Sequence, residues 1–145
     1  MEIRGTGSYL PGKIITNDDL SEVVDTNDEW ISSRTGICQR HISEGETTSE
    51  MAAKAAVVAL EDAEVSPEEV ELIIVATMTG DEAMPGTACK VQKEIGAVHA
   101  ACFDLSAACT GFVFALNTAN AYLASGMYRN ALVIGADMVS KVIDW

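Results

Sequence analysis

The stretch that decides the fold is residues 103–116, which read FDLSAACTGFVFAL. Its first residues form a short apolar run typical of a buried strand. The residues after Cys109 predict a helix that is apolar almost all round, which is the pattern of a helix buried on every side. Cys109 falls where a tight turn passes into this helix. Its neighbours Ala107, Ala108 and Gly111 are small, so a substrate has room to approach the sulfur.

A cysteine at the start of a helix has a specific chemical meaning. The first backbone N–H groups of a helix lack partners within the helix, and the positive end of the helix dipole lies there. Both favour the thiolate form, which is the nucleophile, and the same N–H groups can stabilise an oxyanion formed beside the sulfur. Free cysteine is also a common small hydrophobe of protein cores, so the spacing alone leaves both interpretations of Cys109 open.

Residues 104–112, DLSAACTGF, closely resemble the nucleophile segment of the β-ketoacyl-acyl-carrier-protein synthase III family. The resemblance extends from Ile3 to Trp145 but covers only the N-terminal half of that family. It implies an α/β, thiolase-like fold with a mainly parallel sheet and buried helices. Residues 1–145 would form the N-terminal half-domain. The last strand of that half and the whole C-terminal half, which completes the layered architecture, would lie outside this chain.

The resemblance also implies an activity. Members of the family are acyltransferases that start fatty acid biosynthesis by decarboxylative condensation. Acetyl-CoA or another short acyl-CoA acylates the cysteine, here Cys109, and malonyl-acyl carrier protein is the second substrate. No cofactor and no metal is expected, because acyl-CoA is a substrate. A His and an Asn from the C-terminal half assist decarboxylation, so we expect this chain alone to be inactive and to need a complementary half chain. The completed enzyme is expected to be a homodimer.

A second motif concerns coenzyme A. Trp30 and Arg34 lie four residues apart, so they share a face if residues 26–35 form a helix, for which Thr26 and Glu29 have the spacing of a capping box. An aromatic ring beside a guanidinium suits an adenine ring and its phosphates, although such a pair is also common in ordinary surface packing. The family pattern W-I-x-x-R-T-G-I implies that Trp30 and Arg34 contact the adenine end of coenzyme A. Thr26 is assigned to the same nucleotide.

A third motif precedes a predicted helix that ends at Gly96. Residues 85–92 match the family pattern P-x-x-A-C-x-V-Q. In the family, a large apolar residue just before this proline reaches across the dimer into the partner's acyl pocket, which assigns Met84 to that role. Met84 could equally fill a gap in the core. Cys89 falls inside the helix, where we expect it to pack.

The remaining pattern alternates strands and helices, which predicts a parallel sheet. Strands are expected over residues 3–10, 71–77, 98–105 and 129–135, with Gly5 and Gly7 packed closely against a neighbour. Two helix starts are predicted, one capped by Thr16 or Asn17 and one capped by Thr47, and the helix after Cys109 is expected to end near Ser125. Pro67 predicts one short turn of helix.

The two histidines receive no catalytic role. Arg40 and His41 are interpreted as loop residues. A dyad of His99 with Cys109 is conceivable, but the intervening strand would hold the two side chains far apart. Cys102, within that strand, is expected to be core.

Composition excludes several classes of function. The formal net charge of −13 argues against nucleic acid and anionic membrane surfaces as partners, and no apolar run is long enough to span a bilayer. The four cysteines lack the C-x-x-C spacing of metal sites, and the start lacks the features of a signal peptide, so reduced thiols in the cytoplasm are expected. With nine basic residues, a docking patch for an acidic carrier protein would be a small local cluster or lie outside this chain.

Two other functional classes remain open from the sequence. One is another acyl-CoA enzyme of the same superfamily, such as a hydroxymethylglutaryl-CoA synthase or a thiolase. The other is a non-catalytic subunit that keeps the fold for assembly, against which the presence of Cys109 argues. In every case we expect the apolar helix after Cys109 to leave an exposed apolar patch unless a second half covers it.

Overall fold

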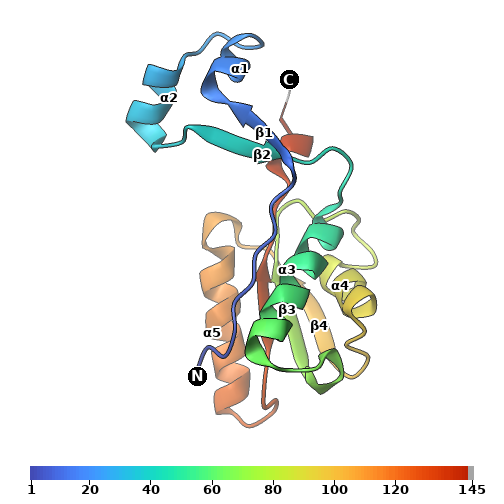
Figure 1. Cartoon of the computed structure of the whole chain (residues 1–145). Helices are drawn as coiled ribbons and strands as arrows, with labels where there is room; N and C mark the ends of the chain where they lie inside the picture. The colour runs from blue at the N-terminus through green and yellow to red at the C-terminus, as the bar shows by residue number, and fades with distance from the viewer. Residues whose placement is uncertain (144–145) are drawn as a thin grey trace. The chain divides into compact units, whose positions relative to one another are not determined.

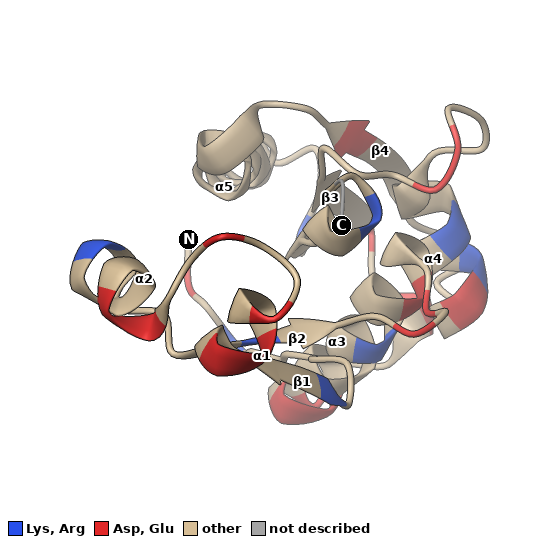
Figure 2. Cartoon of the chain, turned by 90° about the horizontal axis from the view of Figure 1, so that it is seen from above, with Lys and Arg blue, Asp and Glu red and all other residues tan. Residues whose placement is uncertain are grey.

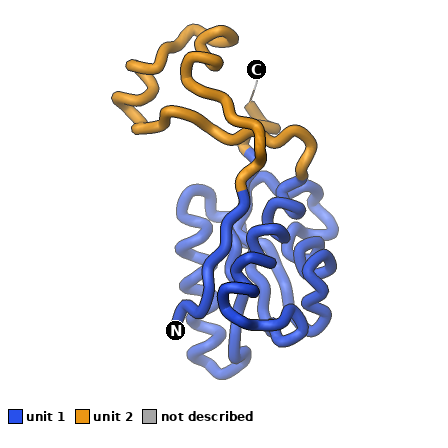
Figure 3. Tube along the Cα trace, in the orientation of Figure 1, with its two compact units in different colours: residues 1–9, 47–138 blue, residues 10–46, 139–145 orange. Residues whose placement is uncertain are grey.

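The computed structural model describes residues 1–143 of the chain. The chain forms two compact units, which are shown in different colours in Figure 3. Unit 1 contains residues 1–9 and 47–138, and unit 2 contains residues 10–46 with the segment that begins at Val139. The sequence-based assignment of residues 1–145 to a single half-domain stays a prediction.

Unit 1 is built on a parallel sheet of three strands in the order β4-β3-β5. The central strand β3 (Leu72–Ala76) pairs with β4 (Ala101–Leu105) and with β5 (Leu132–Gly135). All five residues of β3 are buried, as expected for a central parallel strand. The three predicted strands of this sheet are thus confirmed, with ends a few residues shorter than the sequence pattern indicated.

Helices cover both faces of this sheet, as Figure 1 shows. Side chains of β3 alternate between the two faces. Ile73 and Val75 pack with α3 (Thr48–Ala63) and α4 (Thr87–Ile95), while Leu72 and Ile74 pack with α5 (Gly111–Ala124). Unit 1 therefore has three layers, helix–sheet–helix. Small residues make up much of the contact: the α3 core positions are Ala52, Ala53 and Ala56 with one larger residue, Leu60, and those of α5 are Ala115 and Ala119.

The ends of these helices follow the predicted signals. Thr47 caps α3 in a capping box with Glu50, and Gly96 ends α4. Pro67–Glu69 form a single 3₁₀ turn, η1. Asp81, from the loop after β3, accepts hydrogen bonds from the backbone N–H groups of Thr48 and Ser49. Burial opposes ionisation of Asp81, but the Ser49 hydroxyl, these two N–H groups and nearby Lys90 together lower its pKa.

The predicted first strand over residues 3–10 is wrong. These residues belong to no helix or strand, although their close packing is confirmed. A Cβ atom at Gly7 would lie 2.3 Å from the carbonyl oxygen of Ala55, and one at Gly5 would lie 2.5 Å from that of Ala59. The segment thus lies against the backbone of α3 instead of pairing with a strand. Only glycine permits so close a contact with the helix backbone.

Unit 2 contains a two-stranded antiparallel sheet of β1 (Lys13–Thr16) and β2 (Gln39–Ile42), with α1 (Asn17–Ser21) and α2 (Asp28–Thr35) between them. Of the two predicted caps for α1, Thr16 occupies the N-cap position, and Asn17 is the first residue of the helix. The loop assignment of Arg40 and His41 is wrong, because both lie in β2. The physical reason is a long-range contact: Arg40 donates at 2.7 Å to the side-chain oxygen of the buried Asn17. The side-chain nitrogen of Asn17 donates in turn to Asp28 and to the carbonyl oxygen of Ile37.

Among the described residues, no helix has both the length and the apolar character that a membrane crossing requires.

The close approach of residues 1–9 to α3 gives a direct test. We expect Gly7→Ala to lower the free energy of unfolding by about 1–3 kcal/mol, because the added methyl group overlaps the α3 backbone. The matched control is Gly12→Ala, where a Cβ atom meets nothing within 4 Å. Urea unfolding of both variants measures the difference. Equal stability of the two variants would contradict the packing described.

Candidate active site

Cys109 lies at the carboxyl edge of the parallel sheet, between β4 and α5. After Leu105 the chain turns through a single 3₁₀ turn, η2 (Ala108–Thr110), and α5 begins at Gly111. The predicted position of Cys109, at the passage from turn to helix, is confirmed, and its side chain is exposed. Ala108 has a φ of 47°, in the left-handed region that a residue with a Cβ atom rarely adopts. This strained turn presents the thiol to solvent.

The N-terminus of α5 is not capped by a side chain. Thr110 occupies the N-cap position, but its hydroxyl donates back to the carbonyl oxygen of Ala107 at 3.0 Å and accepts nothing from the first turn of the helix. No side chain therefore caps the amino end of α5 beside Cys109, and the N–H group of Gly111 donates to the carbonyl oxygen of Ala108. The predicted helix start beside Cys109 is thus observed, while the role of Cys109 as a nucleophile beside an oxyanion-binding helix end stays a prediction.

Two close contacts fix the start of α5 on the sheet. A Cβ atom at Gly111 would lie 3.3 Å from the Cβ atom of Ala76, at the end of β3. A Cβ atom at Gly135, at the end of β5, would lie 3.2 Å from the ring of Phe112. The helix can approach the strands this closely only because small residues occupy these positions. The backbone that carries Cys109 is thus held against the ends of both strands.

The structure corrects two expectations for this stretch. β4 is an edge strand and is only partly buried, because β3 covers one side of it alone. α5 is not buried on every side: Gly111, Ala115 and Ala119 are buried, whereas Val113 is 59% exposed and its neighbours Phe112 and Phe114 are also exposed. The expected exposed apolar patch is therefore present on α5.

Polar residues that the sequence analysis did not single out join the loops at this edge. Asp137 follows β5, and its Oδ1 atom accepts from the backbone N–H of Met78 at 2.8 Å and from the hydroxyls of Thr79 and Thr77. Thr79 in turn accepts from the N–H of Met138 at 2.7 Å. The sequence carries a signal for these residues, because polar side chains directly follow two predicted parallel strands. The carboxyl ends of such strands meet at one edge of the sheet.

Trp30 and Arg34 share the exposed face of α2 in unit 2. The guanidinium carbon of Arg34 lies 4.6 Å from the centre of the Trp30 ring, and Trp30 is 54% exposed. The predicted pairing is confirmed. The predicted capping box of Thr26 and Glu29 is wrong, because Asn27 occupies the N-cap position and accepts from the N–H of Trp30 at 2.8 Å. Thr26 precedes this cap, and its assignment to coenzyme A stays a prediction.

Comparison with known proteins shows what this arrangement is similar to. A family model described as 3-oxoacyl-[acyl-carrier-protein (ACP)] synthase III matches residues 103–145. The β-ketoacyl-[acyl-carrier-protein] synthase III of Clostridium acetobutylicum is 59% identical over 145 residues, which are 100% of this chain and 45% of the relative. That of Lactococcus lactis is 56% identical over 144 residues, 99% of this chain and 44% of the relative.

A solved structure agrees with these sequences. The crystal structure of 3-oxoacyl-[acyl-carrier-protein] synthase III from Aquifex aeolicus VF5 superposes with a TM-score of 0.97 at 50% identity, covering 99% of this chain and 47% of that one.

Along its whole length the chain is similar to the N-terminal part of β-ketoacyl-[acyl-carrier-protein] synthase III. The predicted resemblance and the thiolase-like α/β fold class are thereby confirmed. The chain spans about half the length of the curated synthase III relatives that it matches, as expected for the N-terminal half of that family.

The motif of residues 85–92 leads into α4, where Thr87, Ala88 and Val91 are buried. Met84 is 85% exposed, so the alternative that it fills a gap in the core is wrong. Its assignment to a partner's acyl pocket stays a prediction. Cys89 is exposed rather than packed in the core, and its sulfur lies 3.4 Å from that of Cys102, which is partly buried.

His99 lies apart from Cys109 in unit 1. It is an exposed residue of the turn before β4, whereas Cys109 follows the other end of that strand. A five-residue strand spans roughly 16 Å, so the two side chains do not form a dyad. Within residues 1–143, no group of three or more His, Cys, Asp or Glu side chains is arranged to hold a metal ion.

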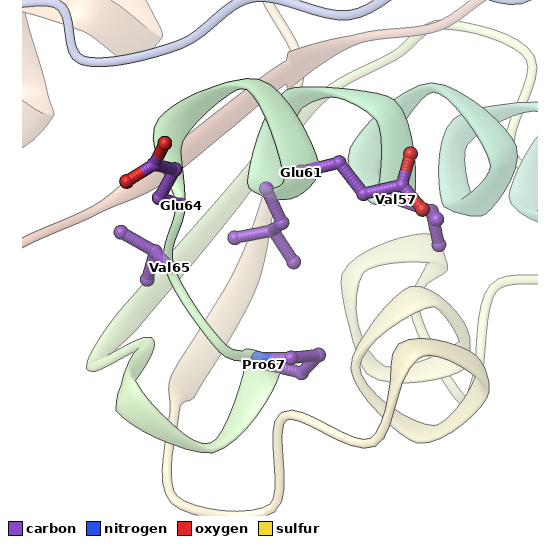
Figure 4. A pocket seen from close by; sticks show the side chains of 6 residues that line it. Val57, Glu61, Glu64, Val65 and Pro67 are labelled. Atoms are coloured by element: carbon purple, nitrogen blue, oxygen red, sulfur yellow. The ribbon is translucent and has the colours of Figure 1, made fainter.

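The charged residues and the groove described next do not indicate a second active site on the described surface. Acidic residues outnumber basic ones in Figure 2, and Lys13, Lys90 and Arg129 already pair with carboxylates. A groove of about 280 Å³ lies beside the last turns of α3 (Figure 4). Because α3 leads into β3 through η1, this groove lies at the amino end of the sheet, away from Cys109. Its lining residues are Val57, Leu60, Glu61, Glu64, Val65 and Pro67.

The Asp137 contacts predict a stability effect at the edge that carries Cys109. Asp137→Ala should lower the free energy of unfolding by about 1–3 kcal/mol, because it leaves the Met78 N–H and two threonine hydroxyls without their acceptor. Asp137→Asn should lose less, since its amide oxygen can replace Oδ1. Urea unfolding measures both, with Asp25→Ala at an exposed position as the control. Loss in Asp137→Asn equal to that in Asp137→Ala would show that the charge, not the acceptor, matters.

Proposed function

We propose that this chain supplies the nucleophile of an acyltransferase that starts fatty acid synthesis. In this proposal Cys109 attacks the thioester carbonyl of acetyl-CoA or another short acyl-CoA. Coenzyme A leaves as its thiol, and the acyl group remains on the sulfur. Decarboxylation of malonyl-acyl carrier protein then yields a carbanion that attacks the acyl-cysteine and releases the β-ketoacyl product. Similarity to synthase III along the whole chain and the exposed thiol of Cys109 support the proposal.

The observation that carries the proposal is the strained turn at Cys109. Acyl transfer passes through a tetrahedral intermediate with a negative oxygen, which backbone N–H groups can stabilise. The amino end of α5 lies next to Cys109 and carries no side-chain cap. In this proposal N–H groups at that helix end stabilise the oxygen, although that of Gly111 donates to Ala108 in the free chain. The left-handed backbone at Ala108 holds the sulfur outward at that point. A purely structural cysteine would need neither feature.

Decarboxylation in the family needs a His and an Asn, and neither His41 nor His99 of this chain lies in the family's motifs for them. We propose that a His and an Asn come from a complementary C-terminal half, which also covers the exposed apolar face of α5. The completed enzyme would work as a homodimer in which Met84 lines the partner's acyl pocket; its 85% exposure leaves it free for that contact. Alone, the chain would not catalyse condensation.

Binding of coenzyme A is proposed for unit 2. Trp30 can stack on adenine, and Arg34 can pair with a phosphate while it remains against the ring. Thr26 would add a polar contact to the same nucleotide. The stacked pair is exposed, so a nucleotide can reach it without rearrangement of α2.

The acyl-enzyme step has a direct test. The purified protein, mixed with separately produced C-terminal residues of the Clostridium acetobutylicum relative, is incubated with acetyl-CoA and its intact mass is measured. We expect one acetyl group on this chain and none on Cys109→Ala. Cys38→Ala, which removes another exposed thiol, is the control and should be acetylated normally. Absence of acetylation in the presence of the second half would favour a non-catalytic subunit.

The nucleotide site predicts a separate effect on substrate affinity. In the same reconstituted protein, Arg34→Gln and Trp30→Ala should each raise the KM for acetyl-CoA by roughly tenfold, the scale of a cation–π contact or a single charged hydrogen bond. The value of kcat should change little, because neither side chain takes part in bond making. Arg4→Gln removes a positive charge elsewhere and should leave KM unchanged. An unchanged KM in Trp30→Ala would exclude the adenine contact.

A further inference from the structure

Two thiols that the proposed reaction does not use lie in contact on unit 1. Cys89 is on α4 and Cys102 is on β4, and their sulfur atoms are 3.4 Å apart. The Cys102 thiol also lies 3.2 Å from the side-chain oxygen of Gln92. Cys89 is exposed, whereas Cys102 packs partly against the core. Cys89 is therefore accessible to reagents, and Cys102 is its partly buried neighbour.

The two elements that carry these thiols are fixed to each other. Asp104 on β4 accepts from the backbone N–H groups of Thr87 and Ala88 at the start of α4, at 2.7 and 2.6 Å. Gln92 donates from its amide nitrogen to the carbonyl oxygen of Ala100 at 2.6 Å. These contacts lie on both sides of the thiol pair. They keep the two sulfur atoms as neighbours, and a disulfide needs them to approach to about 2.05 Å.

We propose that Cys89 and Cys102 are a redox modification site, at which a hydroperoxide converts the two thiols into a reversible intramolecular disulfide. Cys89 is the sulfur that reacts with the peroxide, and Cys102 is the resolving thiol. The modification is independent of Cys109 and of the proposed acyl transfer.

The chemistry balances in two steps. The Cys89 thiolate attacks one peroxide oxygen, the O–O bond breaks, and Cys89 becomes a sulfenic acid while the other oxygen leaves as an alcohol or water. The Cys102 sulfur then attacks the Cys89 sulfur. The S–O bond breaks, the S–S bond forms, and the hydroxyl leaves as water with the proton from Cys102. Two electrons pass from the thiols to the peroxide.

The surroundings of Cys102 suit a resolving thiol. Burial, together with the hydrogen bond and negative charge of Cys89 and the charge of Asp104, raises the pKa of Cys102 to about 11. Cys102 therefore stays protonated at neutral pH and does not itself react with peroxide. Oxidation of Cys89 to the sulfenic acid removes the contribution of its thiol to the raised pKa of Cys102, so Cys102 loses its proton more easily once its partner is oxidised.

The test is disulfide mapping of the purified, reduced protein after treatment with hydrogen peroxide. The protein is denatured in N-ethylmaleimide and its mass is compared with that of an untreated sample. Digestion with trypsin and chymotrypsin then identifies the linked peptides, because chymotrypsin cleaves after Phe103 and Leu105 and so separates Cys102 from Cys109. Cys38→Ser and Cys109→Ser are the controls, and Cys102→Ser is the test variant.

We expect two fewer maleimide adducts, one peptide pair that joins Cys89 to Cys102, and recovery of both thiols with dithiothreitol. Both controls should form the same link. Cys102→Ser should instead leave Cys89 as a sulfenic acid that dimedone traps. Free Cys89 and Cys102 after treatment would overturn the proposal. A link from either residue to Cys109, or between two copies of the chain, would overturn it equally.

Discussion

The pairing of β3 with its two parallel neighbours is the constraint on which the rest of unit 1 depends. Because the three strands run in one direction, their carboxyl ends meet at one edge of the sheet. Backbone hydrogen bonds continue there, from the N–H of Thr77 to the carbonyl oxygen of Leu105 and from the N–H of Ala136 to that of Ala76. Cys109 and Asp137 follow two of these strands and so reach the same edge. Full burial of β3 between helical layers makes this edge rigid enough to hold a strained turn.

The turn at Cys109 combines strain, exposure and an uncapped helix end. Each is unfavourable or neutral for stability by itself, since a left-handed alanine costs free energy and a capped helix is more stable than an uncapped one. Their coincidence at one cysteine supports the proposed acyl-accepting role of Cys109. The surrounding structure compensates through the close contacts of Gly111 with Ala76 and of Phe112 with Gly135.

Local sequence signals predicted the elements whose stability is local. The buried run of β3, the caps Thr16 and Thr47, and the turn at Cys109 were all readable, because each depends on residues a few positions apart. Residues 3–10 have the sequence pattern of a strand but lie against α3. Arg40 lies in β2, where its side chain contacts Asn17, a residue 23 positions earlier in the chain. Such long-range contacts leave no local pattern. For the Asp137 contacts the sequence offers only an indirect signal, the polar residues that follow two parallel strands.

The central claim is that Cys109 is the group on which acyl transfer depends. Its most direct test is competitive alkylation with iodoacetamide, followed residue by residue by mass spectrometry in the presence of the complementary half. Prior incubation with acetyl-CoA should protect Cys109 alone, while Cys38, another exposed thiol, reacts as before. Alkylation of Cys109 at an unchanged rate after acetyl-CoA treatment would contradict the account.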